Sequence, residues 1–140
     1  MDEYQKIGYL HDNFKIFHLS DTSHKEFVYH YHDFNKILIF LKGDVTYTIE
    51  GRTYDLQTND IVFVNAGEVH KPTINSHSNL PYERIVIYVS PDYLNSYQKE
   101  NADLNTCFYQ AHKEQSHVLR MKSFASRPLN NCIQRLEHSL

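Results

Sequence analysis

The chain has 140 residues, a length that suits one domain, and 41% of them are hydrophobic, which is enough for a core. Its 14 basic and 17 acidic residues give a formal net charge of −3, which argues against a nucleic-acid-binding surface. The sequence has no apolar run of membrane-spanning length, no signal-peptide core at its start and no CxxC pair, so we expect a reduced, cytoplasmic protein without a membrane segment.

The first ninety residues have the pattern of short strands separated by turns. After a leading arm over residues 1–12, segments rich in β-branched and aromatic residues alternate with clusters of Gly, Asn, Asp and Ser. Such strands, repeated about every 8–12 residues, are typical of an all-β sandwich or barrel. The predicted strands are 14–19, 26–30, 36–41, 45–49, 53–56, 61–64, 69–74 and 82–89.

The composition changes at Ser90-Pro91, where a helix is predicted to begin. Ser90 suits the N-cap and Pro91 the first helical position. Residues 117–120 suit either a last short edge strand or a turn of helix. The final segment places four apolar residues on one helical face, which must pack on the β-domain or on a partner chain. These residues are Leu129, Ile133, Leu136 and Leu140.

Three histidines and a lysine form the candidate site. His30 and His32 are two residues apart, and in an extended strand such residues share a face, so we expect both side chains to point the same way. His70 follows a predicted turn farther along the chain, and Lys36 begins the strand after His32. Tyr47 alternates with apolar residues on its strand and is expected to face the interior, where core packing and ligand contact are both open.

The order of these residues resembles the two motifs of cupin barrels. In the first motif the HxH at 30–32 and Gly43 match, while Lys36 stands where cupins carry Glu. In the second motif Gly67 and His70 match, while the first Gly and the Pro of the pattern are absent.

More specifically, the chain resembles the N-terminal effector-binding and dimerisation domain of AraC-type transcription regulators over residues 14–140. The similarity is carried by His-Tyr-His-Asp-Phe at 30–34, Tyr-Thr-Ile-Glu-Gly-Arg-Thr-Tyr at 47–54, and the segments 59–70 and 82–94. It implies a mainly β fold, a double-stranded β-helix or jelly-roll barrel followed by α-helices.

In this interpretation residues 1–90 form the cupin-like barrel and residues 91–140 a helical dimerisation extension packed on it as one structural unit. The family's helix-turn-helix DNA-binding domain has no counterpart in these 140 residues. The sequence therefore corresponds either to part of a longer regulator or to a stand-alone cupin.

Three interpretations of the histidines remain open. As ligands of a divalent metal, His30, His32 and His70 would define a metal-dependent cupin enzyme of the dioxygenase or isomerase type, although an ammonium at Lys36 opposes a dication. As part of an apolar pocket, they would bind a small effector, and the expected positive sign of the cluster favours an anionic one. The third interpretation is structural, with the imidazoles capping backbone carbonyls and the Lys36 stem on the outer face.

We expect a sensor rather than an enzyme, with no catalytic residue and no cofactor, a divalent metal being the alternative. The expected partners are a small-molecule effector and a second copy of the chain, with DNA contacted only through a domain outside this sequence. Arg84 is interpreted as structural, paired with Glu83 or Glu68, as readily as ligand-binding. The predicted ligand-binding residues are His30, His32, Lys36, Tyr47 and His70, and the predicted dimerisation residues are Leu129, Ile133, Leu136 and Leu140.

Overall fold

The computed structural model describes residues 4–22, 25–96 and 102–120. These residues form ten strands and two helices. The strands are β1 (Gln5–Lys6), β2 (Phe14–Asp21), β3 (His30–Tyr31), β4 (Asn35–Lys42), β5 (Val45–Ile49), β6 (Arg52–Asp55), β7 (Ile61–Val64), β8 (His70–Ile74), β9 (Tyr82–Val89) and β10 (Val118–Leu119), and the helices are α1 (Pro91–Ser96) and α2 (Ala102–Glu114).

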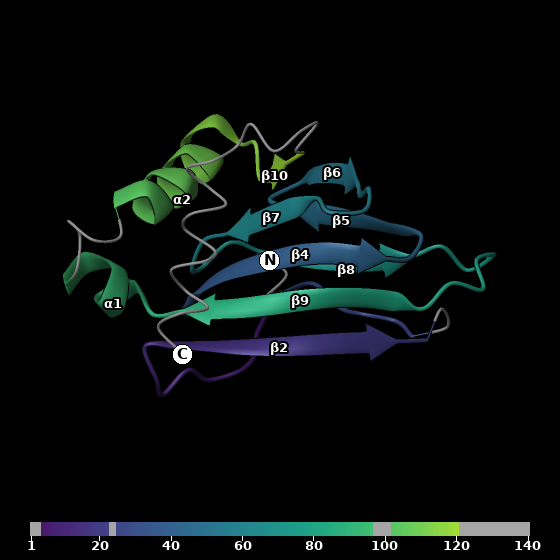
Figure 1. The fold of residues 1–140 in the computed structure, drawn as a ribbon, viewed down its shortest axis with the longest axis horizontal. Coiled ribbons are helices and arrows are strands. Elements are labelled where there is room, and N and C mark those ends of the chain that lie inside the picture. Colours follow the sequence, from purple (N-terminus) through teal and green to yellow (C-terminus); the bar gives the residue numbers. More distant parts are fainter. Residues whose placement is uncertain (1–3, 23–24, 97–101, 121–140) are drawn as a thin grey trace.

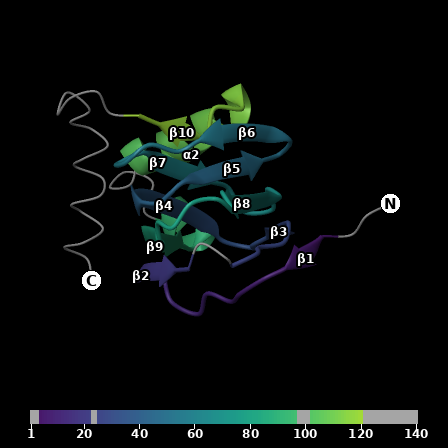
Figure 2. The same cartoon turned by 90° about the vertical axis from the view of Figure 1, so that its right-hand side faces the viewer.

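The strands form two five-stranded sheets that face each other (Figures 1 and 2). The first sheet has the order β1-β3-β8-β5-β6 and the second the order β10-β7-β4-β9-β2. Consecutive strands often lie in different sheets, as β3 and β4 do, so the chain winds between the layers. This arrangement confirms the predicted mainly β, double-stranded β-helix fold followed by helices.

The second sheet is covered on both faces, and this decides where Lys36 points. On β4, Ile37 packs in the cluster that contains the helix residues Leu104 and Phe108, whereas Leu38 packs between the sheets. Side chains alternate along a strand, so Lys36 shares the inner face with Leu38. The continuous apolar run of β4 therefore reflects two buried faces, and its one charged inner residue lies inside the barrel.

Strand β9 contributes a second inner row by the same alternation. Its register with β4 places Lys36 opposite Tyr88 and Phe40 opposite Arg84. Tyr82 and Val86 belong to the inner cluster, whereas their neighbours Ile85 and Ile87 pack toward the helices. Arg84 is therefore the second cation brought into the barrel by strand periodicity.

The helices follow the sheet as the Ser90-Pro91 pair predicts. The Ser90 hydroxyl accepts a hydrogen bond from the Tyr93 backbone N–H at 3.4 Å, and α1 begins at Pro91. Helix α2 packs on β7, with the Phe108 ring edge-on to Phe63 at a centroid distance of 5.4 Å. Of the two predictions for residues 117–120, the edge strand is observed, because β10 pairs with β7.

Two features differ from the predicted elements. Residues 26–29 are not a strand, and only His30 and Tyr31 pair with neighbours. The leading arm is ordered as β1, which runs parallel to β3 at the edge of the first sheet (Figure 2). The Ile7 N–H donates to the Tyr31 carbonyl at 2.9 Å, and Lys6 pairs with Asp33 at 2.7 Å, so backbone and charge together hold the arm.

The predicted dimerisation residues Leu129, Ile133, Leu136 and Leu140 lie outside the described residues, and their role stays a prediction. The same holds for the proposed packing of the whole segment 91–140 as one unit. Among the described helices, none has the length and apolar character needed to cross a membrane.

A candidate ligand pocket inside the barrel

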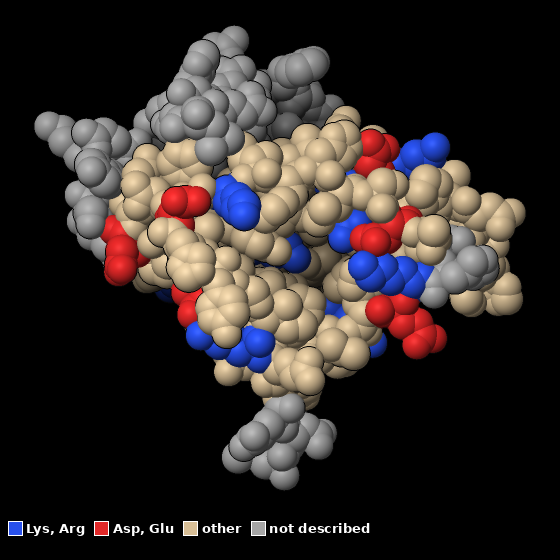
Figure 3. Space-filling model, turned by 90° about the horizontal axis from the view of Figure 1, so that it is seen from below, with Lys and Arg blue, Asp and Glu red and all other residues tan. Residues whose placement is uncertain are grey.

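A pocket of about 410 Å³ opens between β2, β9 and the segment that leads into β3. Figure 3 views this side of the molecule, where the surface is hollowed and Lys or Arg atoms are visible inside the hollow. Its volume lies within the range of small-molecule sites. The pocket is lined by Ile7, Leu19, Lys25, Glu26, Phe27, Val28, His30, His32, Lys36, Pro72, Tyr82, Arg84, Val86 and Tyr88.

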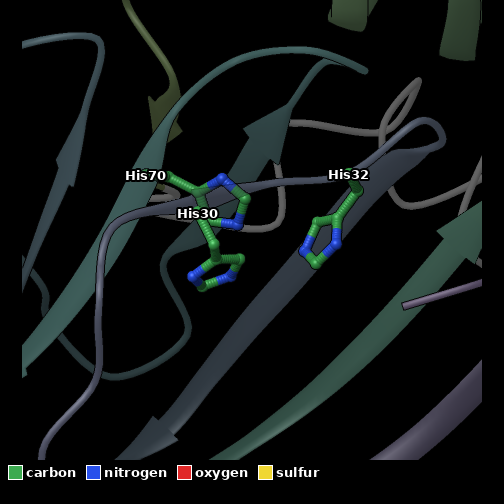
Figure 4. Close-up of side chains that lie close together, drawn as sticks. All are labelled: His30, His32 and His70. Carbon is green, nitrogen blue, oxygen red and sulfur yellow. The ribbon is translucent and has the colours of Figure 1, made fainter. Parts of the chain in front are cut away.

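The structure brings all five predicted ligand-binding residues into one cluster. His30, His32 and Lys36 line the pocket, whereas His70 and Tyr47 are fully buried behind them. The ring centroid of His70 lies 4.3 Å from that of His30 and 4.9 Å from that of His32 (Figure 4). Pairing of β3 with β8 sets His30 directly opposite His70, so sheet register assembles residues that are far apart in the sequence.

Backbone carbonyls fix the tautomer of each imidazole. The Nδ1 atom of His30 donates to the Val28 carbonyl at 2.8 Å, that of His32 to Ile7 at 2.6 Å, and that of His70 to Glu68 at 3.0 Å. A carbonyl only accepts, so each Nδ1 carries a proton and each neutral ring presents Nε2 as a lone pair.

The Nε2 atoms of His32 and His70 are buried and have no hydrogen-bond partner among the described residues. A buried polar atom of this kind is costly and usually has a function.

Burial keeps these imidazoles neutral. It lowers the pKa of His32 to about 4, outweighing the hydrogen bond to Ile7, and the nearby charge of Lys36 acts in the same direction. Burial also lowers the pKa of His30, and it lowers that of His70 well below the usual value, again with a contribution from Lys36. At neutral pH the histidines are hydrogen-bond acceptors, and the positive charge expected of this cluster is carried by Lys36 and Arg84 alone.

Lys36 lies inside the barrel and not on the outer face. Its side chain is 8% exposed, and Nζ donates to the Tyr47 hydroxyl at 2.9 Å. Burial, with a smaller effect of the Arg84 charge, lowers the pKa of Lys36 to about 7. Within the described ranges no carboxylate forms an ion pair with Lys36. The amine therefore changes its protonation state near neutral pH.

Arg84 lines the pocket as well, and the predicted ion-pair partners Glu83 and Glu68 are wrong. Its Nη1 donates to Asp21 at 2.6 Å, and its guanidinium lies 4.1 Å from the Tyr82 ring centroid. The register of β2 with β9 explains this pair, because Asp21 lies opposite Tyr82 and is therefore a diagonal neighbour of Arg84 across the two strands. Glu83 instead meets His18 on the outer side. The alternation of residues 82, 84, 86 and 88 is the sequence signal that could have placed Arg84 inside.

The N-terminal arm closes one side of the pocket, a role that the sequence did not indicate. Ile7 contributes a wall, and its carbonyl is the group that fixes the His32 ring. Gly8 follows in a left-handed conformation with φ +82°, with Phe34 beside it. Phe27 and Tyr88 add aromatic walls that the sequence analysis also missed.

The three histidines meet part of the requirement for a divalent metal. Their ligand atoms lie within 4.8 Å of one another, and hydrogen bonds from Nδ1 to carbonyls are typical of metal-binding histidines. However, ligands at about 2.0–2.1 Å from a tetrahedral ion lie closer together than this. In the part of the chain that is described, no carboxylate joins the group, and Lys36 adds a positive charge. The three imidazoles therefore form a candidate metal-binding group, which the charge of Lys36 opposes.

A buried carboxylate connects the site to α2 and β10. Glu68 is 2% exposed, and its Oε2 accepts from His117 and from His112, each at 2.8 Å. Its Oε1 accepts from the Asn65 N–H at 2.7 Å. Burial alone would raise the pKa of Glu68, but these hydrogen bonds outweigh it and lower the pKa to about 2. The backbone carbonyl of the same residue holds His70.

The fold and the pocket define a cupin-type barrel with an internal pocket large enough for a small molecule. The chain matches the family model described as the AraC-like ligand binding domain over residues 14–139, and it belongs to this family. No curated protein shows a significant match to the sequence. Membership of a ligand-binding family does not favour the alternative of a metal-dependent enzyme.

Solved structures of cupins share the fold. A cupin-like protein from Thermotoga maritima has a TM-score of 0.51 at 20% identity, with 58% of this chain and 60% of that chain covered. A cupin protein from Bacteroides fragilis has a TM-score of 0.50 at 19% identity, with 65% and 87% covered. Vicilin from hazelnut, Corylus avellana, has a TM-score of 0.50 at 22% identity, with 56% of this chain but only 22% of the vicilin covered.

Proposed function

We propose that this chain is the effector-binding and dimerisation domain of a bacterial AraC-type transcription regulator, and that the pocket holds the effector. The observation that carries the proposal is a pocket whose wall contains the buried Lys36 and the His32 imidazole, with its unpartnered Nε2 atom. A ligand that supplies hydrogen bonds there recovers the free energy that these buried atoms otherwise cost. Family membership supports ligand binding as the role.

The effector combines two kinds of polar group. Hydroxyl or other N–H and O–H donors face the Nε2 atoms of His30 and His32, because these rings can only accept. An acceptor group, anionic in our proposal, faces Lys36 and Arg84. Apart from Lys25 and Glu26, the remaining wall is apolar and aromatic, which suits a small molecule with a compact carbon body.

Regulation depends on residues beyond the described part. The chain dimerises through the apolar face of its last segment, and DNA is bound by a helix-turn-helix domain outside this sequence, in the cytoplasm. Effector binding changes how the dimer presents those domains. The face consists of Leu129, Ile133, Leu136 and Leu140.

The sensor works without a metal in this proposal, and metal analysis tests that part. Purified protein is expected to contain no stoichiometric Fe, Mn, Ni or Zn, and EDTA is expected to leave its melting temperature unchanged. A tightly held metal whose removal lowers the melting temperature would instead support a metal site at His30, His32 and His70.

A thermal-shift screen of sugars, carboxylates and amino acids tests the effector site. A ligand at about 100 times its Kd stabilises the fold by roughly 2.7 kcal/mol. The shift is expected to be lost in His32→Gln and kept in His77→Gln, a matched change at an exposed loop histidine. A hit that stabilises both variants equally would place binding elsewhere.

A further inference from the structure

We propose that Lys36 captures its ligand covalently: its amine reacts reversibly with the carbonyl carbon of a small aldehyde or ketone in the pocket and forms an imine. This inference rests on the proposed function and deepens it, because it assigns a chemical class to the effector. Lysine amines are the side chains that form such bonds when they are held in an apolar site.

The surroundings of Lys36 leave its amine available. The side chain lines the pocket wall, and its hydrogen bond to Tyr47 uses an N–H as the donor. A neutral amine that donates to Tyr47 keeps its lone pair free for a carbon electrophile. Among the described residues no carboxylate pairs with it, so protonation is not stabilised by an opposite charge.

The protonation state follows from the same surroundings. Burial and the Arg84 charge lower the pKa of Lys36 to about 7, so about half of the molecules carry the free amine at neutral pH. An exposed lysine with a pKa near 10.4 carries the free amine in roughly one molecule in two thousand at that pH. Other lysines lie at the surface, Lys15 and Lys42 among them, but of the lysines in the described residues Lys36 is the one inside the barrel.

The reaction balances without an oxidant or a reductant. The Lys36 nitrogen lone pair forms the C–N bond while the carbonyl π electrons move to oxygen. One proton leaves nitrogen and one reaches oxygen, which gives a carbinolamine. The C–O bond then breaks as the oxygen takes a second proton and leaves as water, while the nitrogen forms the C=N bond and gives up its remaining proton. Addition of water reverses every step.

The histidines are suited to move these protons. His30 and His32 line the same pocket, and each presents a neutral Nε2 lone pair because Nδ1 is held by a carbonyl. A neutral imidazole can take the proton that nitrogen loses and return it to the leaving oxygen. Phe27 and Val86 add apolar surface to the wall of the same pocket.

Reductive trapping tests the proposal. The protein is incubated with propanal or with pyruvate at neutral pH, with sodium cyanoborohydride as the hydride donor that converts an imine to a stable secondary amine. Intact mass is expected to show one adduct per chain at probe concentrations that leave exposed lysines unmodified, and peptide mapping is expected to place it on Lys36. The trapping rate should rise as the pH passes through about 7.

Matched variants make the result specific. Lys36→Arg and Lys36→Met should both lose the adduct, whereas Lys42→Arg, at the exposed end of the same strand, should keep it. Circular dichroism confirms that each variant is folded. Adducts spread evenly over surface lysines, or an unchanged yield in Lys36→Arg, would overturn the inference.

A parallel binding measurement separates this inference from the proposed function. If compounds without a carbonyl stabilise the protein in a His32-dependent way and no Lys36 adduct forms, the sensor role stands and covalent capture is wrong. If no compound binds in the pocket and no adduct forms, both are wrong. An adduct on Lys36 that raises the melting temperature supports both.

Discussion

Lys36 and Tyr47 join the two sheets through the interior of the barrel. The Lys36 Nζ, on β4 of the second sheet, donates to the Tyr47 hydroxyl, on β5 of the first sheet, at 2.9 Å. Both side chains are buried, so the bond pairs an amine and a hydroxyl that have little contact with water. It also holds the reactive end of Lys36 at a fixed place beside the pocket.

Tyr47→Phe should destabilise the fold by about 1–3 kcal/mol, because it leaves the Lys36 amine buried without its partner. Phenylalanine keeps the ring and its packing, so the loss reports the hydroxyl. Urea denaturation of the wild type, Tyr47→Phe, Lys36→Met and the double variant measures the coupling. Additive effects of the two substitutions would show that the hydrogen bond contributes nothing.

Lys36 should also make stability rise with pH above neutrality. Its pKa is about 7 in the folded protein, below the ordinary value of 10.5. Between these two pH values the Lys36 amine binds more protons in the unfolded chain than in the folded one. Stability therefore increases from about pH 7 upward, by at most ~1.4 kcal/mol per pH unit, and this group contributes no slope below its folded pKa.

The Lys36→Met variant isolates this effect, since methionine fills a similar volume without a titrating group. Denaturant titrations between about pH 6 and about pH 9 should show a rise in the wild type that is reduced in Lys36→Met and retained in Lys42→Arg. Parallel pH profiles for the wild type and Lys36→Met would contradict the buried, partly neutral lysine.

Glu68→Gln should cost about 2–4 kcal/mol near neutral pH, because the charged acceptor of His117 and His112 is lost from a buried site. The pKa of Glu68 is lowered to about 2, so its contribution is fully present above the ordinary value of 4.5 and is lost as the pH falls toward the folded pKa. The difference from the wild type should therefore shrink in acid.

The exposure of the two histidines supplies the control for this prediction. His117 is fully buried, whereas the side chain of His112 is 62% exposed. His112→Ala should cost no more than about 1 kcal/mol, and His117→Ala clearly more. If urea denaturation showed equal losses of stability for both variants, the buried Glu68–His117 pair would not be the stronger contributor.

Gly8→Ala should weaken the docking of the N-terminal arm. Gly8 has φ +82°, which costs an alanine about 1 kcal/mol or more, while its nearest neighbour, Phe34, leaves room for the added carbon at 3.5 Å. Hydrogen exchange at the Ile7 amide, which donates to Tyr31, should accelerate. Gly51→Ala, with φ +83° in the β5–β6 turn, should leave the Ile7 amide unchanged.

Periodicity accounts for what the sequence could predict. The runs of β-formers predicted most strands, and Ser90-Pro91 predicted the start of α1. The two-residue spacing of His30 and His32 placed both rings toward one interior. Alternation along β4 also indicates that Lys36 is buried, because both faces of such an apolar strand are covered and the lysine must lie on one of them.

The features that the sequence did not predict depend on pairings between distant segments. Strand β1 is two polar residues long, so it has no periodic signal, and its order comes from contacts with His30 and Tyr31. The partner of Arg84 follows from the register of β2 with β9, which no local pattern encodes. The tautomer of His32 depends on the Ile7 carbonyl, 25 residues away in the sequence, which only the folded chain brings to it.

Glu68 contacts His70 and helix α2 through two different groups, its backbone carbonyl and its side-chain carboxylate. The backbone carbonyl orients His70 behind the pocket, while the carboxylate binds residues of α2 and the segment before β10. A side-chain substitution at this position therefore cuts the connection to the helix and leaves the imidazole oriented. If the chain is the sensor that we propose, Glu68→Gln is expected to keep effector binding and to lose the connection to α2, which would give a protein that binds but does not respond.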